Sequence, residues 1–337
     1  MNPSTALQFG PYTLPGRLAL SPMAEFTNWP QRLLCQEHGA AFACTEMVKA
    51  KFVAQRHADT LKILERHPDE RLCGGQICGS DEAELAAAAQ ILTRELGYHF
   101  VDFNIACPIR RIVADGAGGG LLATPHKVEK LVRLLAEAAA PAPVSVKMRS
   151  GLDENSINAE DNARAAEAGG ARLIAVHPRT VRQGYGGLAD HAVLARVKAA
   201  VRVPVVGGGD VRGPADAQRL LNQGACDVVY FGRGAVGNPW IFSRSAALIE
   251  QGRELPEPAP TELFRQFRQH AAWLVEHMGE HDACRHLRKL SREYAKRLPS
   301  PVLQGRFYDS FKELERFEDV AGKLGFLAQA IANGLEA

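Results

Sequence analysis

Short apolar runs alternate with amphipathic segments along the first two thirds of the chain. Eight runs rich in Val, Ile, Leu, Ala, Cys and aromatic residues are typical of buried strands. The segments between them carry apolar residues at helical spacing. The predicted strands occupy 17–23, 41–47, 72–78, 98–104, 143–149, 171–177, 202–208 and 225–231, and the clearest predicted helices occupy 81–96, 125–139, 158–170 and 213–224.

This repetition of strand and helix predicts an α/β fold with parallel strands. A parallel sheet is covered on both faces by its crossover helices, which explains why the runs are almost continuously apolar. Eight such units favour a closed (β/α)8 TIM barrel, and an open doubly wound sheet is the alternative. In a barrel, the active site lies where the strands end and the following loops begin.

The strand pattern stops after about residue 245. A proline-rich link, ELPEPAPTE at 254–262, is followed by a helical pattern to the end of the chain. We therefore predict a barrel domain at 1–245 and a smaller all-helical domain at 246–337.

Composition adds limits to this picture. The formal net charge is only +2, so any affinity for nucleic acid must come from locally clustered charge. The seven cysteines form no CxxC pair and accompany no zinc-type histidine spacing, which favours a reducing compartment and no metal site. No apolar run reaches the ~20 residues of a membrane span, and the N-terminus has no signal-peptide pattern. We expect a cytoplasmic protein that does not enter a membrane.

Polar residues gather at the ends of the predicted strands. Helix capping or solvation explains any one of them, but a full ring of polar strand ends indicates an active site. In chain order these residues are Met23, Glu46, Gln76, Asn104 with Cys107, Lys147 with Arg149, His177 with Arg179, Gly207 to Asp210, and Gly232 with Arg233.

Two glycine-rich segments follow predicted strands seven and eight, GGGD at 207–210 and FGRGAVGNPW at 231–240. Barrels commonly hold a phosphate group in this pair of loops, and Arg233 adds a fork-shaped donor. The segment DGAGGG at 115–120 follows a loop instead of a strand, so we interpret it as a mobile loop on the substrate side. No second nucleotide motif is present, and a nicotinamide cofactor is expected to bind only transiently.

Three polar residues suit a flavin ring. Lys147 offers a cation for the negative charge of a reduced flavin, and Gln76 can both donate to and accept from the ring edge. His177 is equally compatible with a structural role.

Cys107 differs from the cysteines inside the apolar runs, because it lies past a strand end beside Asn104, Arg110 and Arg111. These surroundings suit a working thiol, as acid or nucleophile.

The segment 285–298, RHLRKLSREYAKRL, predicts an amphipathic helix with a basic face. Leu287, Leu290, Tyr294 and Leu298 share one side of it. Because this segment carries many cations and almost no acidic residue, we expect it to bind a polyanion such as an RNA backbone. The basic side carries Arg285, Arg288, Lys289, Arg292 and Lys296.

Several motifs occur together in one order: SPMAEFTNWP, GGQICG, DFNIACPIRR, VKMRSG, HPRT followed by GYGG, GGGDV, GRGAVGNPW and RHLRKLSREYAKRLP. On these motifs, the sequence resembles the flavin-dependent tRNA-dihydrouridine synthases of bacteria, closest to their B-type branch, over nearly its whole length. The resemblance implies an FMN-bearing barrel and a helical RNA-binding domain, with NADPH reducing the C5=C6 bond of a uridine in tRNA or rRNA. It also leads us to expect a monomer.

The resemblance implies roles for individual residues. Cys107 would be the general acid, and Asn104 and Arg149 would face the uracil. Arg110, Arg111, Arg285, Arg288 and Arg292 would meet RNA. The cofactor would be bound by Pro22, Met23, Ala24, Gln76, Lys147, His177, Gly208, Gly209, Asp210, Gly232 and Arg233.

The chain departs from the usual family pattern at four places: Glu25 in SPMAE, Ala106 in NIACP, Pro178 in HPRT and Gly208 in GGGD. Two other functions stay open at this point. One is an FMN enzyme that acts on a free small molecule, as dihydroorotate dehydrogenases do. The other is an RNA-binding protein without catalysis.

Overall fold

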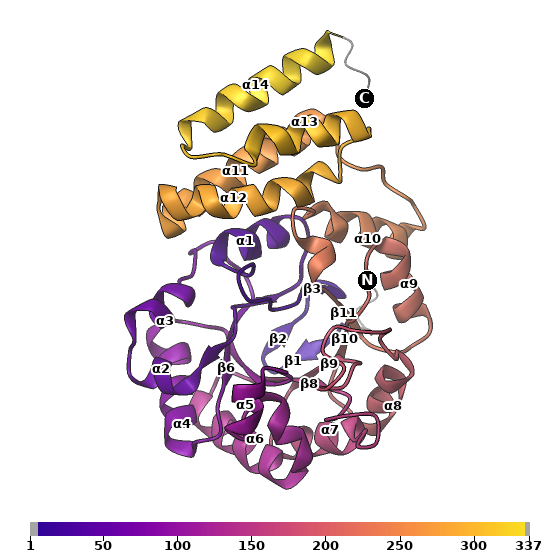
Figure 1. The fold of residues 1–337 in the computed structure, drawn as a ribbon. Helices are drawn as coiled ribbons and strands as arrows, with labels where there is room; N and C mark the ends of the chain where they lie inside the picture. The colour runs from indigo at the N-terminus through magenta and orange to yellow at the C-terminus, as the bar shows by residue number, and fades with distance from the viewer. Residues whose placement is uncertain (1–5, 334–337) are drawn as a thin grey trace.

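The computed structural model describes residues 6–333. Eight parallel strands form a closed barrel, which confirms the predicted fold class (Figure 1). The barrel closes because β4 pairs with both β3 and β6. The barrel strands are β3 (Leu18–Leu20), β4 (Ala43–Cys44), β6 (Cys73–Cys78), β7 (Phe100–Ile105), β8 (Val144–Arg149), β9 (Leu173–His177), β10 (Val205–Gly207) and β11 (Val228–Phe231), and a short β5 (Val48–Lys49) extends the edge of β6.

Helices surround the barrel, and all four predicted helices are present. The segment 81–96 forms α4 (Glu82–Gln90) followed by a π-helical turn at Ile91–Glu95. The segments 125–139, 158–170 and 213–224 form α6 (Pro125–Ala139), α7 (Ala159–Ala168) and α9 (Pro214–Asn222). The remaining helices of this part are α1 (Trp29–Glu37), α2 (Ala50–Ala54), α3 (Ala58–Ile63), α5 (Arg110–Ala114), α8 (Ala192–Ala200) and α10 (Trp240–Gln251).

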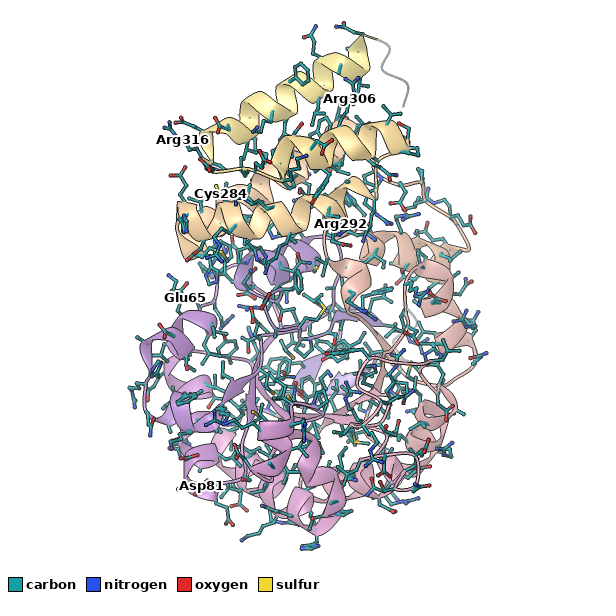
Figure 2. The ribbon with its side chains drawn as sticks, viewed as in Figure 1. Glu65, Asp81, Cys284, Arg292, Arg306 and Arg316 are labelled. Carbon is teal, nitrogen blue, oxygen red and sulfur yellow. The ribbon has the colours of Figure 1, made fainter. Side chains whose placement is uncertain are left out.

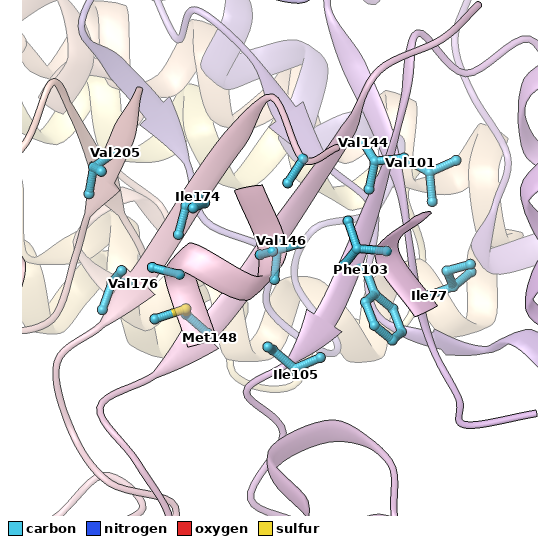
Figure 3. Close-up of a cluster of buried hydrophobic side chains, with 14 of the residues drawn as sticks. Ile77, Val101, Phe103, Ile105, Val144, Val146, Met148, Ile174, Val176 and Val205 are labelled. Atoms are coloured by element: carbon cyan, nitrogen blue, oxygen red, sulfur yellow. The ribbon is translucent and has the colours of Figure 1, made fainter. Parts of the chain in front are cut away.

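Alternate residues of each strand face opposite sides of the barrel wall. The outward residues form an apolar layer beneath the helices, and Figure 3 shows part of it. Neighbouring strands align these residues in register, as in the pairs Val101 with Val144 and Phe103 with Val146. Burial of this layer against the helices is the main contribution to the stability of the barrel.

The inward residues divide the barrel interior into two zones. The zone toward the strand N-termini is apolar, with Phe9, Phe42, Phe100 and Tyr230 packed together. Phe9 belongs to a small hairpin of β1 (Gln8–Phe9) and β2 (Tyr12–Thr13). The zone toward the strand C-termini is polar, so one end of the barrel is filled with aromatic rings and the other is the mouth.

The C-terminal region is helical, as predicted, and has its own apolar core. Its helices lie to one side of the barrel in Figure 1, and α11 packs against α1. They are α11 (Pro260–Met278), α12 (Glu280–Ala295), α13 (Pro301–Phe311) and α14 (Glu318–Ala332). Residue 245, where we placed the boundary, lies inside α10, and the chain from 252 to 259 contains no helix or strand.

Helix α10 joins the two cores. Trp240 packs in the core of the helical region, whereas the next two residues, Ile241 and Phe242, pack in the barrel layer. Just before this helix, a Cβ at Gly237 would lie 2.7 Å from the backbone nitrogen of Tyr294 in α12. The loop after β11 therefore touches the backbone of α12 directly.

Among residues 6–333, none of the helices has the length and apolar character needed to cross a membrane.

Candidate active site

The strand register brings the predicted polar residues to one rim. Asn104 of β7 is the register partner of Lys147 of β8, and Arg149 of β8 is the partner of His177 of β9. The side chains of these four residues face the barrel interior, because the residues that alternate with them along each strand belong to the outer apolar layer. The prediction that the strand ends converge on one mouth is confirmed by this register.

A chain of buried hydrogen bonds crosses the floor of the mouth. Ser145 Oγ and Gln76 Nε2 each donate to the Asp102 carboxylate at 2.5 Å. Asn104 Nδ2 donates to Gln76 Oε1 at 3.0 Å, and Asn104 Oδ1 accepts from the backbone N–H groups of Ala106 and Cys107, both at 2.9 Å. This chain determines which way both side-chain amides point.

Asp102, like Ser145, is a member of this hydrogen-bond chain that the sequence pattern did not single out. Burial raises the pKa of its carboxyl, and the hydrogen bonds from Ser145 and Gln76 oppose that rise. An acid inside the apolar run YHFVDFN was the available signal, because a buried carboxyl needs partners. Asp102 orients Gln76, and through it Asn104.

Cys107 lies at the rim, on the turn that follows β7. It is 8% exposed and packs with Cys78, Ile112 and Ala117. Burial raises the pKa of the neighbouring Cys78 thiol to about 12. Cys78 is thus a protonated thiol at neutral pH and forms part of the apolar wall beside Cys107.

The predicted mobile loop at 115–120 is packed against this turn instead. Gly118–Ala123 form a 3-10 helix, in which Gly118 and Gly119 are buried. The N–H of Gly119 donates to the Cys107 carbonyl, and a Cβ at Gly119 would lie 3.0 Å from that oxygen. A Cβ at Gly120 would lie 2.6 Å from the Val113 carbonyl. These glycines allow two backbone segments to approach closely, and the segment that carries them packs against the turn of Cys107.

Lys147 provides a cation whose charge is easily lost. Burial and the nearby Arg149 lower the pKa of its ammonium to about 8, although Asp102 acts in the opposite direction. At neutral pH the side chain is still mostly protonated. It therefore offers a positive charge on the interior side of β8, which Asp102 only partly compensates.

Arg149 is 2% exposed and donates mainly to the backbone. Nε donates to the Ala106 carbonyl at 2.8 Å, and Nη1 donates to the carbonyls of Thr180 and Gly184. Its guanidinium also lies 5.6 Å from the ring centroid of Tyr185, which is exposed on the β9–α8 loop. Arg149 thus holds the β7 and β9 loops together, and no hydrogen bond of Nη2 is recorded within the described chain.

His177 is neutral and has a defined tautomer. Burial and the cations Lys147, Arg149 and Arg179 lower its pKa to about 2. Arg179 Nη1, which can only donate, lies 3.2 Å from His177 Nε2, so the proton of the imidazole is on Nδ1. Arg179 also pairs with Asp210 at 2.7 Å. Burial alone would raise the pKa of Asp210, but the hydrogen bonds from Arg179 and the Ala189 N–H lower it.

The loops after β10 and β11 form a backbone cradle. Gly209 has φ +85°, and a Cβ there would lie 2.9 Å from Ala189 Cβ. His191 Nε2 donates to the Gly209 carbonyl at 2.7 Å and fixes the following peptide. In residues 6–333, no hydrogen bond is recorded from the backbone N–H groups of Gly209, Asp210, Gly232 or Arg233. Unpaired N–H groups, glycines and an exposed Arg233 fit a phosphate group well.

The β3–α1 loop carries the predicted cofactor residues Pro22, Met23 and Ala24. Met23 is half-buried and touches both cores, and a Cβ at Gly232 would lie 3.7 Å from its Sδ. The loop therefore borders the phosphate cradle.

The basic face of α12 is only partly as predicted. Leu287, Leu290, Tyr294 and Leu298 are buried, as expected, and Arg285, Lys289, Arg292 and Lys296 are exposed. Arg288 is half-buried, and its Nε donates to the Leu314 carbonyl at 2.9 Å. Arg288 therefore connects α12 to the turn after α13.

Arg110 and Arg111 are exposed at the start of α5, next to the Cys107 turn. No ion pair of Arg110, Arg111 or Arg292 is recorded in the part of the chain that the structure describes. Nor does that part contain a group of three or more His, Cys, Asp or Glu side chains arranged to hold a metal ion.

The sequence pattern of the dihydrouridine synthase (Dus) family matches residues 18–329, which include the whole barrel and nearly all of the helical region. The chain belongs to the dihydrouridine synthase family. It is therefore an enzyme, and the family predicted from the sequence is confirmed.

Curated relatives agree with this assignment. The chain is 33% identical over 303 residues to a probable tRNA-dihydrouridine synthase of Treponema pallidum, covering 86% of this chain and 87% of the relative. It is 34% identical over 296 residues to the tRNA-dihydrouridine synthase B of Pseudomonas aeruginosa, covering 88% of each.

Solved structures share the barrel. A morphinone reductase variant in complex with tetrahydroNAD superimposes with a TM-score of 0.56 at 14% identity, covering 77% of this chain and 93% of that chain. An old yellow enzyme homologue from Zymomonas mobilis gives a TM-score of 0.53 at 13% identity, covering 76% and 94%. At these identities the similarity concerns the fold.

Proposed function

We propose that this protein reduces the C5=C6 bond of a uridine in tRNA to 5,6-dihydrouridine, with FMN as its bound cofactor and NADPH as the electron donor. One observation carries the proposal: a thiol on a rigidly supported turn and a phosphate-sized backbone cradle share one barrel mouth. The names of the curated relatives support tRNA as the substrate. Because tRNA is the substrate, we also propose a cytoplasmic location, and we propose that the enzyme acts as a monomer.

The residues of the mouth fit FMN. Its phosphate would lie on Gly208, Gly209, Asp210, Gly232 and Arg233, where unpaired backbone N–H groups meet an exposed guanidinium. Pro22, Met23, Ala24, Gln76, Lys147 and His177 would surround its ring system. Bound FMN, reduced by NADPH, would supply the hydride that uracil receives at C6.

The protein's own contribution begins with Cys107. Hydride addition at C6 leaves a pair of electrons that must be protonated at C5, and a thiol on the opposite face of the base can give that proton. Two hydrogen bonds hold the turn that carries this thiol. The Cys107 N–H donates to Asn104 Oδ1, and the Gly119 N–H donates to the Cys107 carbonyl. Asn104 Nδ2 and Arg149 Nη2 would donate to the uracil carbonyls, where negative charge develops.

The target base must leave its stack to enter the mouth, which calls for a basic surface that holds the RNA backbone. Arg110 and Arg111 on the β7–α5 turn, and Arg285 and Arg292 on α12, would supply it. Arg288 contributes by positioning α12, because its guanidinium contacts Leu314.

The deciding experiment maps dihydrouridine by mass spectrometry in tRNA and rRNA from cells with and without this gene, together with purified protein, NADPH and unmodified tRNA. Loss of dihydrouridine at one tRNA position, restored by the purified enzyme, is the expected result. If all positions persist and the purified protein leaves tRNA unreduced, the proposal fails and an FMN reaction on a free small molecule takes its place. Loss only from rRNA would move the substrate to ribosomal RNA.

A further inference from the structure

The β3–α1 loop holds a glutamate in a left-handed conformation at the rim of the mouth. Glu25 has φ +67°, a region that residues other than glycine rarely occupy. At this position the chain also departs from the usual family motif. The side chain is 72% exposed, so its burial does not explain the conformation.

Two contacts hold Glu25 in place. Its backbone N–H donates to Glu46 Oε2 at 2.7 Å, at the end of β4. Its own carboxylate pairs with the Lys289 ammonium of α12 at 3.1 Å. One residue thus connects the rim of the barrel to the helix that we propose as the RNA-binding surface.

The contact borders a cleft of about 350 Å³ between the rim and α12. The cleft contains the cations Lys62, Arg285 and Lys289, and each has an acidic partner. Lys62 lies 3.8 Å from Glu65, and Arg285 lies 3.7 Å from Asp282. With Lys289 paired to Glu25 and Glu46 close by, the cleft offers a phosphate group little net positive charge.

The C-terminal half of α12 is different. Arg292 is exposed there, and none of the ion pairs within residues 6–333 involves it. Figure 2 labels Arg292 near the end of α12 and Cys284 near its beginning. Arg292 lies one helical turn beyond Lys289, the last residue of α12 that lines the cleft.

We propose that Glu25 is a specificity-determining residue, whose carboxylate occupies Lys289 and keeps RNA phosphate out of the cleft between the β3–α1 loop and α12. A phosphate that entered would have to displace Glu25 from Lys289 and would be repelled by Glu25 and Glu46. RNA that follows the helix is therefore directed toward Arg292. This inference rests on the proposed function, because it concerns how the RNA substrate is positioned.

The test measures the affinity of the full-length protein for a tRNA transcript and for an unrelated hairpin RNA over a series of salt concentrations. Glu25→Gln is expected to tighten binding several-fold and to steepen the salt dependence by about 0.7 to 0.9 in logarithmic slope, the contribution of one added phosphate contact. The hairpin is expected to gain more than the tRNA, so that selectivity falls. Lys289→Gln alone is expected to change little, and adding it to Glu25→Gln is expected to restore the wild-type affinity and slope.

Further variants separate charge from backbone conformation. Glu25→Ala removes the charge but keeps the unfavourable φ, whereas Glu25→Gly removes both. Both are expected to tighten binding, and tightening by the glycine variant alone overturns the assignment to charge. Glu129→Gln is the matched control, because Glu129 forms an exposed ion pair with Arg133 on α6 and its loss changes the net charge equally. That control is expected to leave RNA binding unchanged.

The outcomes distinguish the two proposals. If the wild-type protein binds tRNA and Glu25→Gln changes neither the slope of the salt dependence nor the selectivity for tRNA, the role of Glu25 is overturned and the proposed function stands. Wild-type protein that binds no RNA overturns both.

Discussion

Asn104 and Cys107 are joined by a 2.9 Å hydrogen bond, in which the side-chain oxygen of Asn104 accepts from the backbone N–H of Cys107. Because the same oxygen also accepts from the Ala106 N–H, the asparagine shapes the turn that presents the thiol. The residue that we propose to contact uracil therefore also positions the proton donor.

We predict that Asn104→Ala destabilises the fold by roughly 2–6 kcal/mol, since it leaves two buried N–H groups unpaired at about 1–3 kcal/mol each. Asn104→Asp keeps an acceptor for both groups and is expected to destabilise less, while it loses the donor to Gln76. Urea unfolding of the two variants checks this. Equal stability of Asn104→Ala and wild type would contradict the structural role.

For Cys107, we predict that Cys107→Ala still allows NADPH to reduce the flavin but forms dihydrouridine at least about 100-fold more slowly, the usual contribution of a general acid. Stopped-flow flavin reduction and single-turnover product analysis separate the two steps. Cys78→Ala serves as the control, because this neighbouring buried thiol has no proposed part in the reaction. Wild-type product rates in Cys107→Ala would remove Cys107 from that role.

The backbone cradle is tested by Gly209→Ala. The added Cβ would lie 2.9 Å from Ala189 and 3.1 Å from His177, in a backbone conformation that disfavours a side chain. We expect the variant to purify with much less flavin than wild type. Gly213→Ala is the matched control, because nothing lies within 4 Å of its added Cβ. Full flavin content in Gly209→Ala would be evidence against this cradle.

Lys147 gives a pH dependence of definite sign. Its folded pKa of about 8 is below the ordinary value of 10.5. Between those values the unfolded chain binds more protons than the folded one, so this group makes the flavin-free protein more stable as pH rises from about 8 to 10.5. We expect Lys147→Met to be more stable than wild type at pH 7 and to lose this advantage toward pH 10. Denaturant unfolding at several pH values measures the difference, and an advantage that is constant with pH would show that burial of the charge is not its cause.

Two arginines on α12 are expected to behave differently. Arg292→Glu should weaken tRNA binding and leave the melting temperature unchanged, because this side chain is exposed. Arg288→Glu should lower the melting temperature, because it loses the hydrogen bond to Leu314. Calorimetry and filter binding on the same preparations separate the effects. A drop in tRNA affinity for Arg288→Glu without loss of stability would return that residue to the RNA surface.

Much of the fold could be predicted because its signals are local. Strand and helix periods are properties of short windows, and they located all eight barrel strands and the ring of polar strand ends. The helical periodicity that placed Arg288 on the basic face of α12 could not show that its guanidinium donates to the Leu314 carbonyl, because Leu314 belongs to another segment.

The details of the site were harder to predict because they depend on several loops at once. Arg149 donates to Ala106, Thr180 and Gly184, whose carbonyls converge only in the folded barrel. The same holds for the glycines at 118–120, whose pattern suggested a mobile loop although a Cβ at each would crowd Cys107, Ile112, Val113 or Val181. Asp102 was recognisable as a buried acid, but its link to Gln76 requires the register of β6 and β7.

The close approach of Gly237 to Tyr294, together with the packing of α10 in two cores, has a consequence for how a substrate would be selected. The loop after β11 contacts the backbone of α12, and α10 packs in both cores, so these contacts hold the helical region against the barrel and set the distance between Arg292 and the Cys107 thiol. Under the proposed function, this distance would select a uridine by how far it lies from the RNA backbone bound at Arg292, without recognition of the neighbouring nucleotides.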